Sequence, residues 1–253
     1  MYKALITDLD GTAVAISSDG ADIDTATKSA VRRAISGGKK LTCATGREWE
    51  LVKNIIKELG FVSPCIIEGG TRIIDPRTEK TLWEKSLTEG APDSILAIFR
   101  SETTEGVVMH SMDTTRQPLA GVRTLPSTLR FLYLLAVEED VANKISTKIN
   151  AQGKAVAHLT PSWEGARLVD IHVTHPEATK AHAIHIWQQL ENITKGETVG
   201  MGDSGNDIPI FQSSGLKVAV GNATVGLKAL ADYIAPSVDQ HALEHVIDRF
   251  LLS

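Results

Sequence analysis

Apolar and polar positions alternate in blocks along the first sixty residues. Short apolar runs at 3–9, 40–44 and 64–67 have the length and composition of buried strands. Between them, segments 24–35 and 48–59 place apolar side chains at the three- and four-residue spacing of a helix. Strands and helices that alternate at such short intervals predict a parallel α/β sheet.

The last third of the chain repeats this rhythm. Strands are predicted at 198–201 and 216–220. Helical spacing recurs in four segments, which are 178–190, 207–213, 224–231 and 240–251. The two ends of the chain therefore belong to the same α/β architecture.

The middle of the chain has a different pattern. Helices are predicted at 94–100 and 141–151, and strands at 106–110, 128–137 and 167–173. Strands interleaved with only two helices are typical of a separate α+β domain. We therefore predict a core domain made of residues 1–82 and 176–253, with an inserted domain at 83–175.

The composition of the chain argues against several classes of binding partner. The formal net charge is -5 and no Lys/Arg-rich run occurs, which argues against a nucleic-acid binder. The N-terminal apolar run is too short for a signal peptide, and no stretch approaches the roughly 20 apolar residues that span a bilayer. Cys43 and Cys65 lie in apolar runs, so we interpret them as small buried side chains in a reducing compartment. We expect a cytoplasmic protein that binds neither nucleic acid nor membrane, and its oligomeric state stays open.

Two acids directly follow the first predicted strand, in the motif Asp8-Leu9-Asp10-Gly11-Thr12. In an open α/β sheet, ligands bind at the carboxyl ends of strands. Carboxylates at such an edge attract a divalent cation, and Gly11 permits a tight turn after the strand. Alone, the motif also fits a calcium loop or a simple turn.

Three further segments place polar residues at predicted strand or helix ends. Ala44-Thr45-Gly46-Arg47 follows the second strand and offers a hydroxyl and backbone amides to an anion, although Thr-Gly there is often only a helix cap. Lys180 begins a helix, where a lysine is usually a surface residue. The segment 200–207, with sequence GMGDSGND, gathers two acids and an asparagine in a glycine-rich turn and is the most specific of the four.

Together and in this order, the four motifs resemble those of the haloacid dehalogenase superfamily of phosphotransferases, over residues 2–74 and 179–252. The position of the inserted domain is similar to that in Cof-type sugar phosphatases and phosphomannomutases of subfamily IIB. The resemblance implies a Rossmann-like parallel-sheet core with an inserted α+β cap of type C2B. Glu68-Gly69-Gly70 departs from the Asn-Gly-Ala that is more common in these proteins.

The resemblance also implies roles at the reacting centre. Asp8 would be the nucleophile that forms an aspartyl-phosphate, and Asp10 would be the general acid and then the general base. Mg²⁺ would be bound by Asp8, by the backbone carbonyl of Asp10 and by Asp203. These roles fit phosphoryl transfer, which depends mainly on positioning and on neutralising charge.

The remaining site residues are assigned in the same way. Thr45, Gly46, Lys180 and Asn206 would bind the phosphoryl group. Asp207, with Asn206, would orient Lys180 and metal-bound water. Arg47 is a candidate substrate contact.

Three functions are compatible with these motifs. We expect an Mg²⁺-dependent phosphomonoesterase that acts on a small phosphorylated metabolite such as a sugar phosphate. A sugar-phosphate mutase would share the site, and a phospho-accepting signalling module ranks low because such domains are about half as long and need no inserted cap. His182 and His185 are interpreted as an ordinary helix face, since no acid or cysteine completes a zinc site with them.

Overall fold

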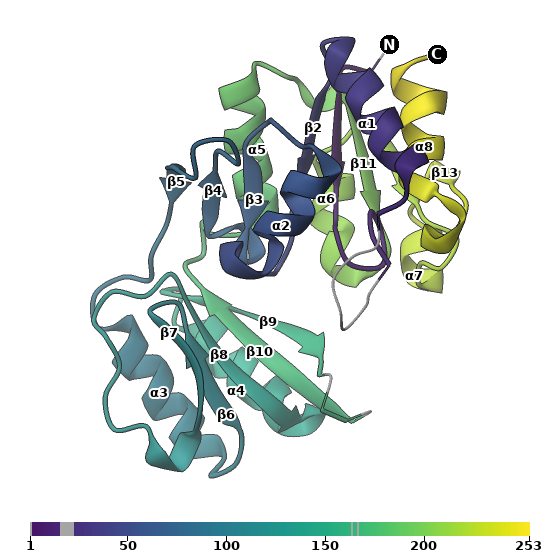
Figure 1. Ribbon diagram of the computed structural model, residues 1–253. Helices are drawn as coiled ribbons and strands as arrows, with labels where there is room; N and C mark the ends of the chain where they lie inside the picture. Colours follow the sequence, from purple (N-terminus) through teal and green to yellow (C-terminus); the bar gives the residue numbers. More distant parts are fainter. Residues whose placement is uncertain (1, 16–22, 163, 166) are drawn as a thin grey trace. The chain divides into compact units, whose positions relative to one another are not determined.

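The computed structural model describes residues 2–15, 23–162, 164–165 and 167–253. The chain forms two compact units (Figure 1). The first consists of Met1–Trp83 and Lys180–Ser253, and the second of Glu84–Thr179. The predicted mixed α/β class is confirmed, with a central parallel sheet and separate antiparallel sheets.

A five-stranded sheet in the order β13-β12-β11-β1-β2 forms the centre of the first unit, and all of its neighbouring strands run parallel. Its strands are β1 (Ala4–Thr7), β2 (Lys40–Cys43), β11 (Thr198–Gly202), β12 (Leu216–Ala219) and β13 (Tyr233–Ile234). Four of these strands were predicted. The two-residue β13 was not, because it is too short to leave a periodic pattern.

The third predicted strand, β3 (Cys65–Ile67), joins β2 through a single parallel bridge between Ala44 and Ile66. It also begins a small sheet of its own, in the order β3-β4-β5, in which β3 and β4 are antiparallel. The added strands are β4 (Arg72–Ile74) and β5 (Thr81–Glu84). Neither was predicted, since β4 has three residues and β5 is largely exposed.

Helices cover both faces of the parallel sheet. Their bounds are α1 (Thr25–Ser36), α2 (Trp49–Leu59), α5 (Lys180–Glu191), α6 (Ile208–Gln212), α7 (Val225–Lys228) and α8 (Ala242–Val246). Leu5 of β1 packs in one apolar cluster and its neighbours Ala4 and Ile6 in another, so both faces of this strand are buried. This explains the continuous apolar run of β1, which is typical of parallel sheets.

The last predicted helix, 240–251, changes its hydrogen bonding along its length. After α8 the chain continues as a π-helical turn over Ile247–Leu251. Short 3₁₀ turns cover Glu68–Gly70, Leu119–Gly121, Lys195–Glu197, Gly205–Asp207 and Val238–Gln240.

The second unit is an antiparallel sheet in the order β7-β6-β8-β10-β9. Its elements are α3 (Ala91–Glu102), β6 (Val107–His110), β7 (Asp113–Pro118), β8 (Phe131–Glu138), α4 (Glu139–Ala151), β9 (Val156–Pro161) and β10 (Leu168–Thr174). Alternate residues of β8 and β10 pack with Phe99 of α3 and Ile145 of α4 in one apolar cluster. The edge strands β7 and β9 were missed because their sequences are polar or mixed.

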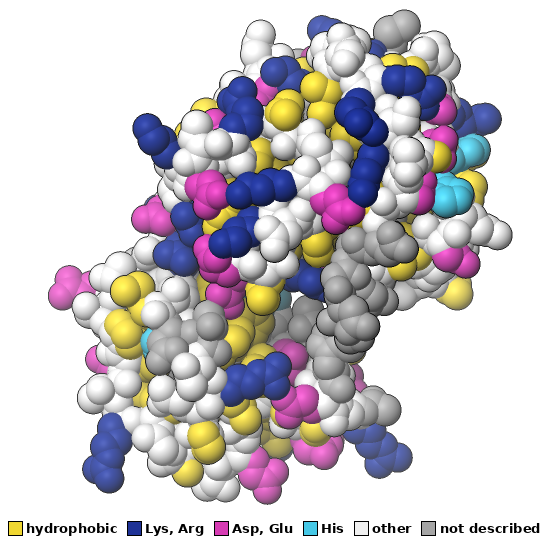
Figure 2. All heavy atoms as spheres, viewed as in Figure 1, with side chains coloured by type: hydrophobic (Ala, Val, Ile, Leu, Met, Phe, Trp, Pro, Cys, Tyr) yellow, Lys and Arg dark blue, Asp and Glu magenta, His cyan; other side chains and the backbone are white. Residues whose placement is uncertain are grey.

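Acidic and basic side chains are interspersed on the face seen in Figure 2. Within the described ranges, no helix combines the length and the apolar character needed to cross a bilayer.

His172 of β10 is a buried titratable group in the second unit. Its ring stacks on Tyr133 of β8 with 4.2 Å between ring centroids, and its Nε2 has no hydrogen-bond partner among the described residues. Burial, and to a lesser extent His158, lowers the pKa of His172 from 6.5 to about 3. The folded unit therefore holds this imidazole neutral.

Acid should destabilise the second unit through this histidine. Between pH 6.5 and about 3, the unfolded chain binds a proton on His172 that the folded chain does not bind. The free energy of unfolding should therefore fall as the pH falls through this window, by up to about 1.4 kcal/mol per pH unit. Hydrogen exchange of β8 and β10 amides at several pH values measures it.

His172→Gln should remove this component of the pH dependence. His185→Gln, at an exposed position on α5, is the matched control and should keep it. An unchanged pH dependence in His172→Gln would contradict the assignment.

Candidate active site

The carboxyl ends of β1 and β11 bring two predicted site segments together. The strands are parallel neighbours with Thr7 opposite Met201, and the Asp8 N–H donates to the Met201 carbonyl at 3.0 Å. Asp8 therefore lies beside the turn that carries Asp203 and Asp207. One carboxylate oxygen from each of these three acids lies within 4.8 Å of the others.

The ammonium of Lys180 lies between two of these carboxylates. Lys180 is the first residue of α5, and its Nζ donates to Asp8 Oδ1 at 3.1 Å and to Asp207 Oδ1 at 2.9 Å. The side chains of Lys180 and Asp8 are 7% and 8% exposed, and that of Asp207 is fully buried. The lysine thus serves as the buried counter-charge of the site.

Asp207 is fixed on its other side by the backbone. Its Oδ2 accepts from the N–H groups of Asp203 at 3.0 Å and Ser204 at 3.2 Å. The turn approaches so closely that a Cβ on Gly202 would lie 2.5 Å from the Cβ of Asp207. Glycine is therefore required at position 202 by space, because real Cβ atoms do not approach one another this closely.

The electrostatics show an excess of negative charge. Burial, with a smaller contribution from Asp207, raises the pKa of Asp8 to about 7 even though Lys180 opposes the shift. Burial and Asp207 together raise the pKa of Asp203 to about 6. Burial alone would lower the pKa of Lys180, but the charges of Asp8 and Asp207 outweigh it and raise that pKa above its ordinary value.

Asp10 is held outside this group of acids by Arg47. The two oxygens of Asp10 accept from Nε of Arg47 at 2.7 Å and from its Nη2, a bidentate arrangement. The backbone N–H of Arg47 donates to Thr45 Oγ1 at 3.2 Å, and its carbonyl accepts from the Glu68 N–H at 2.9 Å. Arg47, predicted as a substrate contact, is thus the partner of Asp10 in this structure.

The hydrogen bonds of Glu68 give the unusual Glu-Gly-Gly motif a structural role. Its φ of 54° lies in the left-handed region, and its carboxylate accepts from Thr71 Oγ1 at 3.1 Å. The Glu68 N–H donates to the Arg47 carbonyl, and the N–H of the next residue, Gly69, donates to the Thr45 carbonyl at 3.0 Å. The turn thereby fixes the loop that carries Thr45 and Arg47.

The structure places the other predicted phosphate-binding residues, Thr45, Gly46 and Asn206, in three different surroundings. Thr45 is buried directly beyond β2, where the Ala44 N–H donates to the Thr7 carbonyl at 2.9 Å, so it shares the sheet edge with Asp8. Gly46 has open space in the direction of a Cβ. Asn206 is exposed and accepts from Ser204 Oγ at 2.8 Å, whereas the acid that contacts Lys180 is Asp207. The role of Asn206 toward Lys180 stays a prediction.

Two residues support the site without having been predicted. Thr12 Oγ1 donates to Asp203 Oδ1 at 3.3 Å. The amide of Asn222 donates to the Gly11 carbonyl at 2.8 Å and accepts from the Val238 N–H at 2.9 Å. Asn222 follows the end of β12, so its place beyond a strand end is the signal that could have revealed it.

The clustered ligand atoms fit Mg²⁺. All three are carboxylate oxygens, which hard divalent cations prefer, and no imidazole or thiolate belongs to the group. Asp207 is fully buried, with one oxygen accepting from two backbone N–H groups and the other from the Lys180 ammonium. Asp8 and Asp203 are therefore the acids that could hold the ion, and the side chain of Asp10 is engaged by Arg47.

Comparisons with known proteins show which family the chain is similar to. The family described as haloacid dehalogenase-like hydrolase matches residues 5–118 and 127–247. The putative phosphatase YxeH of Bacillus subtilis is 23% identical, with all of both chains covered. Phosphoglycolate phosphatase 1 of Saccharolobus solfataricus is also 23% identical, over 99% of this chain and 96% of its own. The solved structure of the subclass IIB sugar phosphatase BT4131 superposes with a TM-score of 0.74 at 21% identity, covering 98% of each chain.

Removing the buried ammonium should destabilise the first unit. Lys180→Met leaves the carboxylates of Asp8 and Asp207 buried without their counter-charge, which costs about 3 kcal/mol in the free energy of unfolding. Urea unfolding in metal-free buffer, followed by tryptophan fluorescence, measures the loss.

Lys28→Met is the matched control within the same unit. Lys28 pairs with Glu58 at the surface, so its removal should cost less than about 1 kcal/mol. Equal losses in the two variants would show that the Lys180 pairs do not stabilise the fold.

Proposed function

The chain belongs to the haloacid dehalogenase-like hydrolases and is a phosphatase, and we propose that it hydrolyses sugar phosphates through an aspartyl-phosphate on Asp8. The observation that carries this proposal is the position of Asp8. It lies buried at the end of β1, hydrogen-bonded to Lys180 on one side and grouped with Asp203 and Asp207 on the other. Lys180, together with a divalent ion held by Asp8 and Asp203, would let this carboxylate meet a phosphoryl group without mutual repulsion.

In the first step, an oxygen of the Asp8 carboxylate attacks phosphorus and the bond from phosphorus to the leaving oxygen breaks. Lys180 has three N–H donors and gives two of them to Asp8 and Asp207, so the third is left for a phosphoryl oxygen. Thr45 Oγ1 accepts from the Arg47 N–H, and its own O–H is the donor that we assign to a second phosphoryl oxygen. When bound, Mg²⁺ would offset negative charge between Asp8 and Asp203.

We assign proton transfer to Asp10. Its protonated carboxyl gives the proton to the leaving alkoxide as the phosphorus–oxygen bond breaks, and the carboxylate so formed takes one from the water that hydrolyses the aspartyl-phosphate. Its side chain lies outside the group formed by Asp8, Asp203 and Asp207, so it is not needed there as a ligand of the ion. In the free enzyme Arg47 holds it in one orientation.

The substrate class is inferred from relatives and from the inserted unit. BT4131, similar over nearly the whole chain, is a sugar phosphatase, and the inserted Glu84–Thr179 unit is the segment that we expect to select the substrate. Phosphoglycolate belongs in the same substrate panel because of the Saccharolobus relative. A sugar-phosphate mutase would instead return the phosphoryl group to the sugar, so isomer exchange without phosphate release identifies it.

Asp8→Asn should abolish turnover. The amide keeps the shape of the side chain but is not a nucleophile, so phosphate release with Mg²⁺ should fall by roughly three orders of magnitude or more. A phosphate-release assay over a panel of phosphorylated metabolites measures it, with thermal unfolding to show that the variant is folded. Asp93→Asn, on the exposed side of α3, is the control and should keep full activity. Near-normal turnover by Asp8→Asn would refute the proposal.

Asp10→Asn should discriminate between leaving groups. A sugar alkoxide needs a proton as it departs, whereas p-nitrophenolate leaves without one. We therefore expect kcat/KM to fall by about 10²–10⁴ for a sugar phosphate and by much less for p-nitrophenyl phosphate. Equal losses for the two substrates would assign Asp10 to binding and not to proton transfer.

A further inference from the structure

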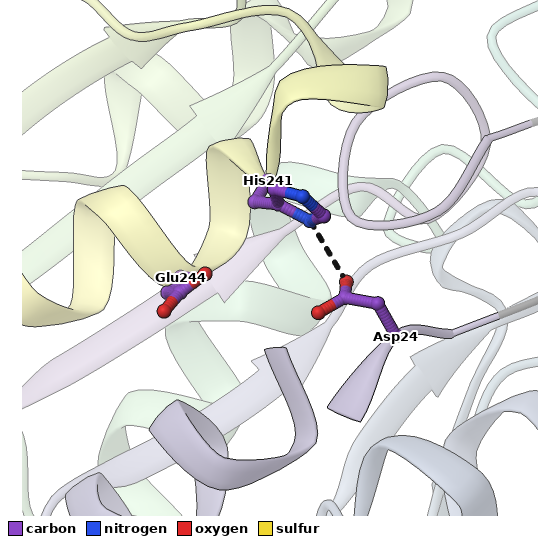
Figure 3. Close-up of side chains that lie close together, drawn as sticks. All are labelled: Asp24, His241 and Glu244. Carbon is purple, nitrogen blue, oxygen red and sulfur yellow. Dashed lines mark ion pairs between the residues drawn. The ribbon is translucent and has the colours of Figure 1, made fainter. Parts of the chain in front are cut away.

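A second group of metal-ligating side chains lies in the first unit. It consists of Asp24, which precedes α1, and of His241 and Glu244 at the start of α8 (Figure 3). One ligand atom from each lies within 4.8 Å of the other two, and Nδ1 of His241 lies 3.0 Å from Asp24 Oδ2. Two segments from opposite ends of the chain thus bring three donor groups to one place.

The donor set differs in kind from that of Asp8, Asp203 and Asp207. An imidazole nitrogen with two carboxylate oxygens suits zinc and its d-block neighbours, whereas Mg²⁺ and Ca²⁺ prefer oxygen alone. We propose that Asp24, His241 and Glu244 form a binding site for a divalent ion of the zinc class, separate from the oxygen-only group at the active site.

Local hydrogen bonds and backbone conformation orient two of the proposed ligands, Asp24 and His241. The carboxylate of Asp24 is fixed because its two oxygens accept from the N–H of Thr27 at 2.9 Å and from its hydroxyl at 2.7 Å. His241 has φ of 59°, just outside α8, and Figure 3 shows its ring directed at Asp24. Ligating carboxylates are commonly held by such outer hydrogen bonds, which orient the ligand before the ion arrives.

The surroundings leave room for an open coordination position. His241 and Glu244, though not Asp24, line a surface hollow of about 530 Å³, together with His245, Asp248 and Arg249. His245 is engaged elsewhere, because its Nε2 lies 2.8 Å from the Tyr233 hydroxyl and the two rings stack. Three protein ligands with space for water are the arrangement of zinc sites that keep an exchangeable position.

Binding there would tie the start of α1 to the start of α8. These helices already contact each other, and Arg33 of α1 pairs with Asp248 at 2.7 Å just beyond α8. An ion that binds the folded unit and not the unfolded chain adds to stability by mass action. The structural alternative is a simple His241–Asp24 ion pair, which at this exposure contributes little.

The test is a Zn²⁺ titration of the full chain by calorimetry, with Mg²⁺ in large excess to occupy the oxygen-only group. We expect one Zn²⁺ per chain and a rise in the unfolding temperature. His241→Gln and Glu244→Gln should each weaken Zn²⁺ binding by about tenfold or more. His185→Gln on α5 removes an exposed imidazole elsewhere and should bind Zn²⁺ as the wild type does. Asp24 is left unchanged because it caps α1.

Co²⁺ provides an independent readout. Its visible absorption should show coordination by a nitrogen ligand in the wild type and lose that signature in His241→Gln. The proposal is overturned if the wild type takes up no Zn²⁺, or if either variant binds it as tightly as the wild type. None of these readouts requires phosphatase activity, so the outcome is independent of the proposed function.

Discussion

The active-site end of the first unit depends on one buried ammonium between two buried carboxylates. Lys180 joins Asp8, at the end of β1, to Asp207, in the turn after β11, and so links α5 to two strands of the central sheet. Ion pairs at this depth stabilise only when their remaining hydrogen bonds are satisfied. That condition is met at Asp207, whose second oxygen accepts two backbone N–H groups.

The acids of the site lie in different electrostatic surroundings. Burial among like charges raises the pKa of Asp8 and Asp203, so a cation near them is electrostatically favoured. Asp10 is two residues from Asp8 in the chain, yet the guanidinium of Arg47 holds its carboxylate apart. In the mechanism we propose, this separation leaves Asp10 for proton transfer and leaves Asp8 and Asp203 for the phosphoryl group and the ion.

The parts that the sequence predicts are those with a local physical signature. The strand β1 could be predicted because burial on both faces makes its sequence continuously apolar, and Asp8 and Asp203 because strand ends collect ligands. The strands β7 and β9 could not be predicted. They are edge strands with polar or mixed sequences, and they form only because they pair with the neighbouring strands. The partners of Asp10 and of Asn222 leave no periodic trace either, because each bond joins distant segments whose approach only the fold determines.

The central claim is that Asp8 carries the phosphoryl group. The most direct measurement is an acid quench of the enzyme during turnover of a sugar phosphate, followed by mass spectrometry of its peptides. The account predicts a phosphoryl group on the peptide that contains Asp8, lost on treatment with hydroxylamine as an acyl-phosphate would be. A phosphoryl group on any other side chain, or steady phosphate release with none on Asp8 under any quench, would contradict it.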